Sequence, residues 1–445
     1  MMNWLKSRRK KNNDRVDGVS IDPVIIQRAE HNVSRSNIDE PALKVLYRLH
    51  KAGYQACLVG GAVRDLLLNR HPKDFDVATD ATPEQVSKLF RNCRLIGRRF
   101  RLAHVHFGRQ IIEVATFRAP HGEAHHEHHD ESGRILRDNV YGEIHDDVWR
   151  RDFTANALYY NIADFSIIDY VGGVDDIADR RLRLIGDQET RYREDPVRML
   201  RAIRFASKLG FSIDQACRAA MLELGPLLVD VPPARLFEEV LKLFHSGHAE
   251  DSLEALQEYD LLKYLFPDAA EALQDPTVAE FVRLAMQSTD QRVRLDKPVT
   301  PAFLFAALLW APVKQQTQAN VDAGMPHAVA LQKAATRLIA HQLHYVSIPK
   351  RFTTIMRDIW ALQARFRHRS GKRAYGVLHH PKFRAAYDFL CLRANAGEVE
   401  TDDCRWWTEL QENAPEQQQK IVAGGKQGAP RKRRSRPKRD KGGRR

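Results

Sequence analysis

The sequence has few cysteines and no apolar run of membrane-spanning length. Its 445 residues include 5 cysteines, an odd number with no short metal-binding spacing, which argues against a disulfide framework. The most hydrophobic stretch, Ala302 to Ala311, is too short to cross a bilayer. Basic residues at the N-terminus lead into polar ones and not into the apolar core of a signal peptide. These absences predict a cytoplasmic protein with reduced thiols and no membrane contact.

Positive charge is concentrated at one end of the chain. The sequence has 70 Lys and Arg against 57 Asp and Glu, a net charge of +13. Residues 426–445 hold 11 basic residues and one acidic residue, or +10, which leaves +3 for the other 425 residues. Such a tail is expected to bind polyanions without sequence preference. The length also exceeds what one hydrophobic core usually supports, so several domains are expected.

Residues 56–80 contain the most informative pattern in the chain. A predicted strand ends in Gly60-Gly61, a short helix follows, and Asp74 and Asp76 lie on a second predicted strand. Side chains two apart on a strand share a face, and the two carboxylates repel unless a cation lies between them. Hard oxygen ligands suit Mg²⁺, and glycines let backbone amides approach a phosphate. The order of these features favours a metal-dependent phosphoryl-transfer site over a solvated strand edge.

Two further acidic residues are candidates for a third carboxylate. Glu113 is the acid in the apolar strand predicted over residues 111–117, where a charge is costly unless it is paired with an arginine or bound to a metal. Asp152 opens a helix predicted to run through Tyr160, and its position also suits an N-cap. The sequence leaves open which of the two completes the metal site.

A family resemblance rests on the segments GGAVRD, beginning at Gly60, and KDFDVAT, beginning at Lys73. Together they resemble the catalytic signature of class II template-independent nucleotidyltransferases, the family of bacterial poly(A) polymerases and tRNA CCA-adding enzymes. The resemblance spans roughly residues 41–410. It implies an α+β fold in which a polymerase β-like head, a mixed sheet with helices, precedes an all-α neck and body. It also implies Asp74 and Asp76 as ligands of two Mg²⁺, with Mn²⁺ as an alternative.

The resemblance also assigns roles to residues outside the acidic pair. Arg-Arg-Asp-Phe-Thr at 150–154 matches the second family motif, in which the arginine contacts triphosphate and Asp152 is catalytic. Glu-Asp-x-x-Arg at 194–198 matches the base-selecting motif. At 100° per residue the arginines of the helix that follows share one arc. The implied nucleotide contacts are Gly60, Gly61, Arg64, Arg151, Asp195, Arg198, Arg201 and Arg204.

The resemblance and the composition together predict the domain organisation. The expected order is a flexible basic arm (1–40), a catalytic head (41–190), a helical neck with the nucleotide-selecting motif (191–250), an RNA-binding helical body (251–410) and a disordered Arg/Lys-rich tail (411–445). The five histidines between residues 120 and 138 are interpreted as part of a mobile surface loop and not as a zinc site.

The expected activity is transfer of AMP from ATP to the 3′ ends of mRNA and small RNA, which promotes RNA decay. Residues 95–104 resemble the segment that distinguishes bacterial poly(A) polymerases, with Arg98, Arg99 and Arg101 placed for phosphate contacts. The first alternative is a CCA-adding enzyme and the second is a non-catalytic RNA-binding protein. A metal-dependent phosphohydrolase is a weaker interpretation. RNA-decay proteins are candidate partners, and the oligomeric state is left open.

Overall fold

The computed structural model describes residues 22–97, 101–119 and 141–424. The histidine-rich segment 120–138, Arg98, Arg99 and the basic tail from residue 425 lie outside these ranges. Of the described residues, those up to Pro232 together with Asp251–Tyr264 form one compact unit. Pro233–Glu250 and the residues from Leu265 onward form the other.

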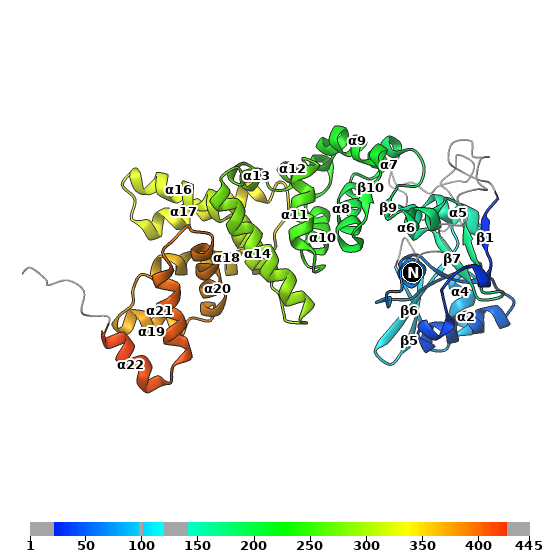
Figure 1. Cartoon of the computed structure of the whole chain (residues 1–445), viewed down its shortest axis with the longest axis horizontal. Coiled ribbons are helices and arrows are strands. Elements are labelled where there is room, and N and C mark those ends of the chain that lie inside the picture. The colour runs from blue at the N-terminus through cyan, green and yellow to red at the C-terminus, as the bar shows by residue number, and fades with distance from the viewer. Residues whose placement is uncertain (1–21, 98–100, 120–140, 425–445) are drawn as a thin grey trace, which may run out of the picture. The chain divides into compact units, whose positions relative to one another are not determined.

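The first unit is built on a mixed sheet of eight strands in the order β1-β8-β7-β2-β3-β6-β5-β4. Figure 1 labels β1, β5, β6 and β7 of this sheet. The pair β3–β6 is parallel and the neighbouring pairs are antiparallel. The strands are β1 (Val24–Ile26), β2 (Ala56–Val59), β3 (Asp76–Thr79), β4 (Cys93–Ile96), β5 (Leu102–Phe107), β6 (Gln110–Thr116), β7 (Leu158–Asn161) and β8 (Ile167–Asp169).

Local sequence signals account for the elements around the catalytic strands. All four residues of β2 are buried, as their uninterrupted apolar character requires for a central strand. Helical spacing predicts a helix from Pro41 to about Gly53, and Thr82-Pro83 predicts a capped helix that runs through Phe90. The helices α2 (Glu40–Lys51), α3 (Gly61–Leu67) and α4 (Pro83–Leu89) begin and end near the predicted positions. Thr82 caps α4, and its hydroxyl accepts from the Gln85 amide at 3.3 Å. Gly108-Arg109-Gln110 predicts a tight turn between two strands, and the β5–β6 hairpin confirms it.

The helix predicted from Asp152 through Tyr160 is wrong. The chain forms α5 (Ile144–Trp149), a short 3-10 turn η3 (Thr154–Asn156) and then strand β7. Tyr159 and Tyr160 are fully buried in β7, which pairs with β2 and β8. Aromatic residues fit a buried pleated surface, and this non-local pairing overrides the helical spacing. For residues 169–187 the sequence pattern also predicts a strand-turn-strand, but this segment contains the helix α6 (Gly173–Ala178).

A small parallel pair and a set of helices complete the first unit. Strands β9 (Arg181–Leu182) and β10 (Ser212–Ile213) pair in parallel. The helices are α7 (Gln188–Glu194), α8 (Val197–Leu209), α9 (Gln215–Leu224), most of α11 (Ala249–Glu258) and α12 (Leu262–Leu265), with the 3-10 helix η4 (Gly225–Asp230). Met199, Leu200 and Ile203 of α8 are fully buried, opposite the predicted arginine face.

The described part of the second unit is helical. Its helices are α10 (Pro233–Phe244), α13 (Pro267–Ala272), α14 (Pro276–Arg294), α15 (Pro301–Leu308), α16 (Trp310–Asp322), α17 (His327–Gln342), α18 (Lys350–Arg365), α19 (Gly371–Leu378), α20 (Phe383–Asn395), α21 (Thr401–Glu412) and α22 (Pro415–Gly424). Trp407 of α21 is fully buried, and its indole donates to the Phe366 carbonyl at 2.8 Å. None of the described helices is both long and apolar enough to span a bilayer.

Three expectations about the chain ends and thiols are corrected. Val24–Ile26 lies within the predicted flexible arm but pairs with β8, because its β-branched residues suit an edge strand. Pro415–Gly424 lies within the predicted disordered tail but forms α22, whose Val422 is buried against α19 and α21. Cys391 and Cys404 form a disulfide with Cα atoms 5.2 Å apart. The packing of α20 on α21 brings these cysteines together, which their spacing in the sequence does not indicate.

Candidate active site

Three carboxylates meet where β3 begins and pairs in parallel with the middle of β6. Asp76 is the first residue of β3, and Asp74 precedes the strand by two positions. The register pairs Val77 with Val114, so Asp76 and Glu113 occupy adjacent register positions on β3 and β6. Glu113 is half-exposed, and its Oε1 lies 3.5 Å from His104 Nε2 on β5. The two strands therefore bring together the acidic pair and one candidate third carboxylate.

The electrostatics of this acidic site are unfavourable without a counter-charge. Desolvation, followed by the charges of Glu113 and Asp74, raises the pKa of Asp76 to about 6, although Arg151 acts in the opposite direction. The Asp76 side chain nevertheless reaches solvent. In the part of the chain that the structure describes, no three acidic, imidazole or thiol groups already stand in metal-binding geometry. Mutually repelling oxygen ligands still match a hard divalent cation, whose charge relieves the repulsion.

The Asp152 carboxylate forms ion pairs with two arginines of α8. Its Oδ2 accepts from Arg201 Nε at 2.6 Å, and its Oδ1 lies 3.5 Å from Arg198 Nε. The Asp152 carbonyl accepts from the Ile185 amide at 3.0 Å, and no helix begins at this residue. The structure therefore places Glu113 beside the acidic pair and directs Asp152 towards the arginines of α8.

The double glycine forms a turn against a buried arginine. Gly60 has φ +67° and ψ −131°, a conformation that only glycine adopts without strain. A Cβ at Gly60 would lie 3.5 Å from Arg151 Nη1. Arg151 Nη2 donates to Asp147 Oδ2 at 2.9 Å and its Nε to the Tyr159 hydroxyl at 2.8 Å. Burial lowers the pKa of the Arg151 guanidinium. Its interactions with Tyr159 and Asp147 raise this pKa by more than burial lowers it, so Arg151 stays charged beside the turn.

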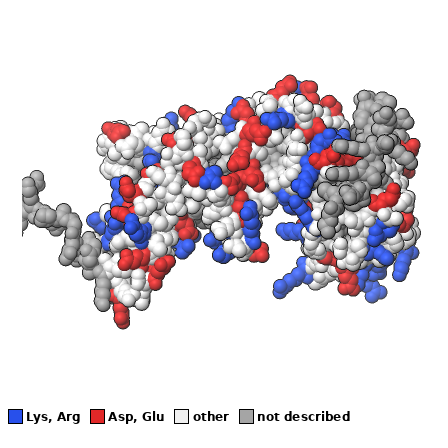
Figure 2. Space-filling view, in the orientation of Figure 1, with Lys and Arg blue, Asp and Glu red and all other residues white. Residues whose placement is uncertain are grey.

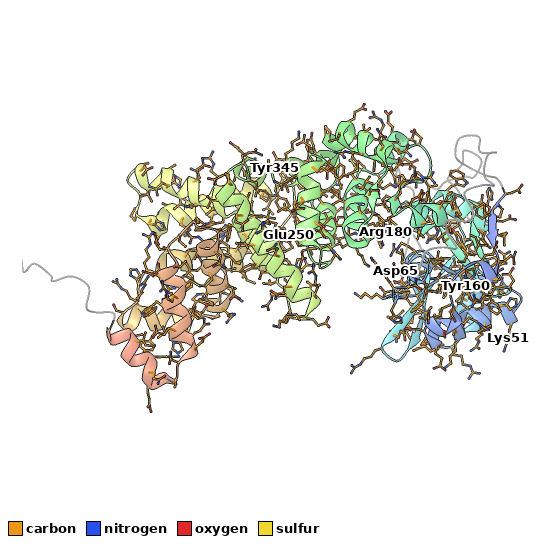
Figure 3. The ribbon with its side chains drawn as sticks, in the orientation of Figure 1. Lys51, Asp65, Tyr160, Arg180, Glu250 and Tyr345 are labelled. Atoms are coloured by element: carbon orange, nitrogen blue, oxygen red, sulfur yellow. A yellow bond between two sulfur atoms is a disulfide. The ribbon has the colours of Figure 1, made fainter. Side chains whose placement is uncertain are left out.

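Arg64 lies beneath the same turn and is almost completely buried, with 3% of its side chain exposed. Its Nη2 donates to Asp65 Oδ1 at 2.7 Å, and its Nη1 donates to Asn156 Oδ1; Asp65 is labelled in Figure 3. The Asn156 carbonyl accepts from Arg151 Nη1 at 3.4 Å. Asn156 therefore accepts hydrogen bonds from both Arg64 and Arg151 next to the glycine turn. Sequence reasoning missed this residue, because a lone asparagine in a predicted helix carries no signal.

The Glu-Asp-x-x-Arg segment at residues 194–198 is held in place by hydrogen bonds at the start of α8. Arg198 Nη1 donates to the Arg191 carbonyl at 2.6 Å and to Glu194 Oε2 at 2.8 Å. The Asp195 carboxylate accepts from the Val197 amide at 3.2 Å. Only 12% of the Arg198 side chain is exposed. These contacts fix the direction of the guanidinium before any ligand arrives.

The ring of Phe205 connects the arginines of α3 and α8. The guanidinium carbons of Arg64 and Arg201 each lie 5.7 Å from the centre of this ring, and that of Arg204 lies 4.5 Å away. Cations over an aromatic face are attracted by its quadrupole. The phosphate-facing arginines predicted from separate motifs therefore meet at one ring. Arg101, in contrast, pairs with Glu84 of α4.

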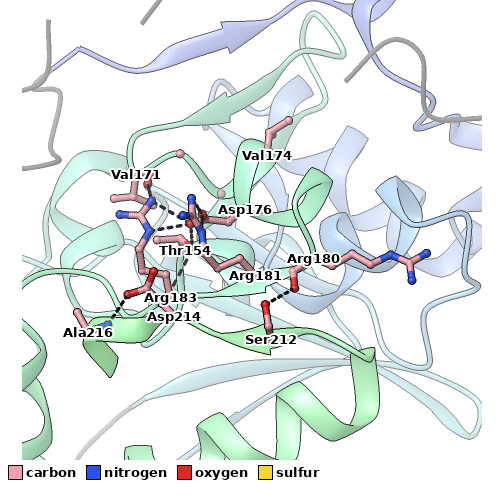
Figure 4. Close-up of polar contacts among 12 residues, drawn as sticks. Thr154, Val171, Val174, Asp176, Arg180, Arg181, Arg183, Ser212, Asp214 and Ala216 are labelled. Carbon is pink, nitrogen blue, oxygen red and sulfur yellow. Dashed lines mark hydrogen bonds and ion pairs between the residues drawn. The ribbon is translucent and has the colours of Figure 1, made fainter. Parts of the chain in front are cut away.

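A buried ion cluster supports the segment that carries Arg151 and Asp152 (Figure 4). The Asp176 carboxylate of α6 is fully buried and accepts from the Thr154 hydroxyl at 2.6 Å. Arg181 Nη2 and Arg183 Nε lie 2.7 Å and 2.9 Å from its two oxygens. Because Arg181 begins β9 and Arg183 directly follows it, Asp176 links the segment around Thr154 to the chain that leads into α7 and α8. Sequence reasoning also missed this residue.

We expect Asp176→Ala to destabilise the protein by about 3 kcal/mol, because it leaves two partly buried arginines without their counter-charge. This loss of about 3 kcal/mol is at the lower end of the cost of breaking a buried ion pair, because 40% of the Arg181 side chain and 23% of the Arg183 side chain are exposed. Urea unfolding of the variant measures the loss. Asp175→Ala, which removes an exposed carboxylate from the same helix, is the control. Equal stability of the two variants would contradict the assigned role of the cluster.

The chain matches three sequence families over most of its length. Residues 56–183 match the family described as "Poly A polymerase head domain", residues 210–273 match "Probable RNA and SrmB- binding site of polymerase A", and residues 323–441 match "Polymerase A arginine-rich C-terminus". The first match contains the acidic pair, the double glycine and Arg151. The second lies C-terminal to the base-selecting motif.

Full-length relatives and a solved structure agree with these matches. Poly(A) polymerase I of Salmonella typhimurium is 49% identical over 428 residues, covering 93% of this chain and 91% of the relative. Poly(A) polymerase I of Haemophilus influenzae is 43% identical over 410 residues, covering 90% and 91%. The Bacillus stearothermophilus CCA-adding enzyme in complex with CTP is 26% identical with a TM-score of 0.55, covering 88% of this chain and 90% of that one. The chain therefore belongs to the poly(A) polymerase I family of template-independent nucleotidyltransferases.

Proposed function

We propose that this chain transfers AMP from ATP to RNA 3′-hydroxyl groups, releases pyrophosphate, and repeats the step without a nucleic-acid template. The observation that carries the proposal is the grouping of Asp74, Asp76 and Glu113 where β3 begins beside the middle of β6, in the same unit as the Gly60 turn and Arg151. Full-length similarity to poly(A) polymerases I supports the choice of ATP and RNA as substrates.

Asp74, Asp76 and Glu113 are the proposed holders of Mg²⁺ or Mn²⁺. Their oxygen donors and mutual repulsion fit a hard divalent cation. When bound, such ions lower the pKa of the attacking hydroxyl and stabilise charge on the pyrophosphate leaving group. Asp152 is proposed to act in the site through Arg198 and Arg201 and not as a metal ligand.

The nucleotide is proposed to bind between the glycine turn and α8. Gly60 and Gly61 admit phosphate oxygens close to the backbone, and Arg151 supplies a fixed positive charge there. Asp195 and Arg198 are proposed to hydrogen-bond the edge of the base. The guanidinium groups of Arg64, Arg201 and Arg204 lie around the Phe205 ring. We assign these three arginines to contacts with the triphosphate and to positioning the residues that bind it.

Acidic and basic side chains are interspersed over the face seen in Figure 2. We therefore propose that RNA binds to local clusters of basic residues. One cluster surrounds the junction of α18 and α19, where Arg365, Arg367, Lys372 and Arg373 are exposed. The basic residues after 425 add a sequence-independent electrostatic contribution. We further propose a cytoplasmic enzyme whose tails mark mRNA and small RNA for decay, with RNA-decay proteins as partners.

Metal binding is expected to weaken as pH falls through about 6. The raised pKa of Asp76 means that a proton competes with the cation at this oxygen. One competing proton predicts an apparent Mg²⁺ affinity about tenfold lower at pH 5 than at pH 7. Titration of Mn²⁺ followed by water proton relaxation measures the affinity without catalysis. An affinity that does not change over this range would refute the assignment of Asp76 as a ligand.

The proposed reaction is tested by extending a labelled, unstructured RNA with purified protein, Mg²⁺ and each nucleoside triphosphate separately. Long ladders with ATP alone are expected. Incorporation of CTP followed by one ATP, confined to tRNA ends, would instead indicate CCA addition. No extension with any nucleotide, together with retained RNA binding, would indicate a non-catalytic RNA-binding protein.

A further inference from the structure

The second unit contains a pocket that the proposed reaction does not use. It has a volume of about 340 Å³ and lies between the end of α14, the residues after it, and α20. Pockets of this size accept small ligands, and a mononucleotide falls in the same range. The residues that matter here are Arg292, Leu295, Lys297, Arg384, Tyr387 and Asp388. All belong to the helical body, whereas the catalytic carboxylates belong to the other compact unit.

The pocket has a surplus of positive charge. Arg384 Nε lies 3.0 Å from Asp388 Oδ1, which is the only acidic residue among those that line the pocket. Arg292 Nη2 donates to the carbonyl of Pro298 at 2.9 Å, a neutral acceptor, and its charge acts on the same Asp388 carboxylate as Arg384 does. Within the described ranges, Lys297 has neither an ion pair nor a side-chain hydrogen bond. Three cations therefore face one carboxylate, which suits an anionic ligand.

The pocket also offers flat and apolar surface next to the cations. Arg384 lies over the ring of Tyr387, with its guanidinium carbon 5.4 Å from the ring centre. The Tyr387 hydroxyl is hydrogen-bonded to Thr408 Oγ1 at 2.6 Å, so the ring beneath the guanidinium is fixed. Leu295 is 55% exposed at the end of α14. Guanidinium planes and apolar side chains are surfaces on which nucleobases stack.

We propose that this pocket binds one nucleotide of the RNA substrate, with its phosphate at Lys297 and Arg384 and its base against Leu295 and the Arg384–Tyr387 pair. A bare inorganic anion would leave the flat surface unused, and the acidic side chains of a peptide carry no aromatic ring to stack on it. Free ATP already has a proposed site in the other unit. The inference rests on the proposed function in one respect, namely that RNA is the substrate.

The test uses full-length protein and a labelled 20-nucleotide RNA without ATP. Lys297→Gln/Arg384→Gln is expected to weaken RNA binding about tenfold and to reduce the salt slope by about 0.7, the value for one phosphate of a single strand that is no longer neutralised. Lys333→Gln/Arg337→Gln is the matched control, since it removes two exposed cations of α17 in the same unit. Lys297→Gln alone should show about half of the slope change, and it breaks no contact within the described fold.

A second measurement identifies the occupant. RNA containing 4-thiouridine should crosslink to peptides of α20 or of residues 292–297, and the double variant should lose this crosslink. RNA affinity equal to that of the control variant would overturn the proposal. Loss of an ATP-binding event with unchanged RNA affinity would also overturn it and would identify a free-nucleotide site. Failure of the wild-type protein to extend RNA would refute the proposed reaction but not the pocket, because binding is measured without ATP.

Discussion

Asp76→Asn is expected to lower the rate of RNA extension by about a thousandfold or more. The substitution removes one charged ligand from the proposed metal site, and bound metal contributes several kcal/mol to the transition state of such reactions. The variant should retain RNA affinity, because the proposed RNA contacts lie in the helical body and the tail. Single-turnover extension with saturating ATP measures the rate, and filter binding measures the affinity for RNA.

The stability of this variant distinguishes loss of chemistry from loss of fold. In the folded protein the pKa of Asp76 is raised from 3.8 to about 6, so at pH 7 folding disfavours the ionised carboxylate when no metal is present. A neutral amide relieves this repulsion, and the metal-free variant should melt at the same or a higher temperature. Asp80→Asn, an exposed carboxylate just after β3, is the control. Wild-type extension by Asp76→Asn would refute the site.

The sequence predicted the elements that depend on neighbouring residues. The strand before Gly60, the helix after it and the cap at Thr82 follow from local apolar spacing, glycine freedom and side-chain hydrogen bonding. The predicted alternation is seen in the exposure of Asp74 and Asp76 on either side of the buried Phe75, although β3 begins only at Asp76 and Asp74 lies outside the strand. These features occupy a single short stretch, so no long-range packing is needed to place them. The acidic pair and the glycine turn were therefore predictable as a unit.

The rest of the site depends on packing between distant segments. The neighbour of Asp76 is set by the parallel register of β3 and β6, which the sequence does not specify, so Glu113 and Asp152 remained equivalent candidates. Asp152 finds its partner Arg201 49 positions later in the chain. The helical spacing around Asp152 was misleading because Tyr159 and its neighbours are buried in the centre of the sheet.

Supporting residues were the hardest to recognise. Asn156 and Asp176 carry no motif of their own, and each acquires its role only when two or more arginines converge on it. The disulfide between Cys391 and Cys404 has the same origin, since it requires α20 to pack on α21. A single sequence indicates which residues can take part in the chemistry, whereas the contacts that hold those residues in place follow from the tertiary fold.

Arg198→Ala is expected to reduce the preference for ATP over CTP by about a hundredfold. The Arg198 guanidinium is fixed by Glu194 and the Arg191 carbonyl, so it meets an incoming base in a set orientation. A site built to hydrogen-bond one base edge discriminates by leaving polar groups unpaired against the wrong base. The variant should therefore lose kcat/KM for ATP far more than for CTP. Arg198→Lys should recover little, because a lysine lacks the planar fork.

The ratio of the two nucleotides separates base recognition from other roles of the arginine. A residue that only binds phosphate or supports α8 affects ATP and CTP alike, so an equal loss of kcat/KM for both would refute base selection. Arg193→Ala is the matched control, since this neighbouring arginine is 52% exposed and pairs with Glu189 on the same helix. Its kcat/KM for each nucleotide should stay within about twofold of wild type, as exposed pairs contribute little. These results would show that the Arg198 guanidinium, held by the Glu194 carboxylate and the Arg191 carbonyl, selects the nucleotide.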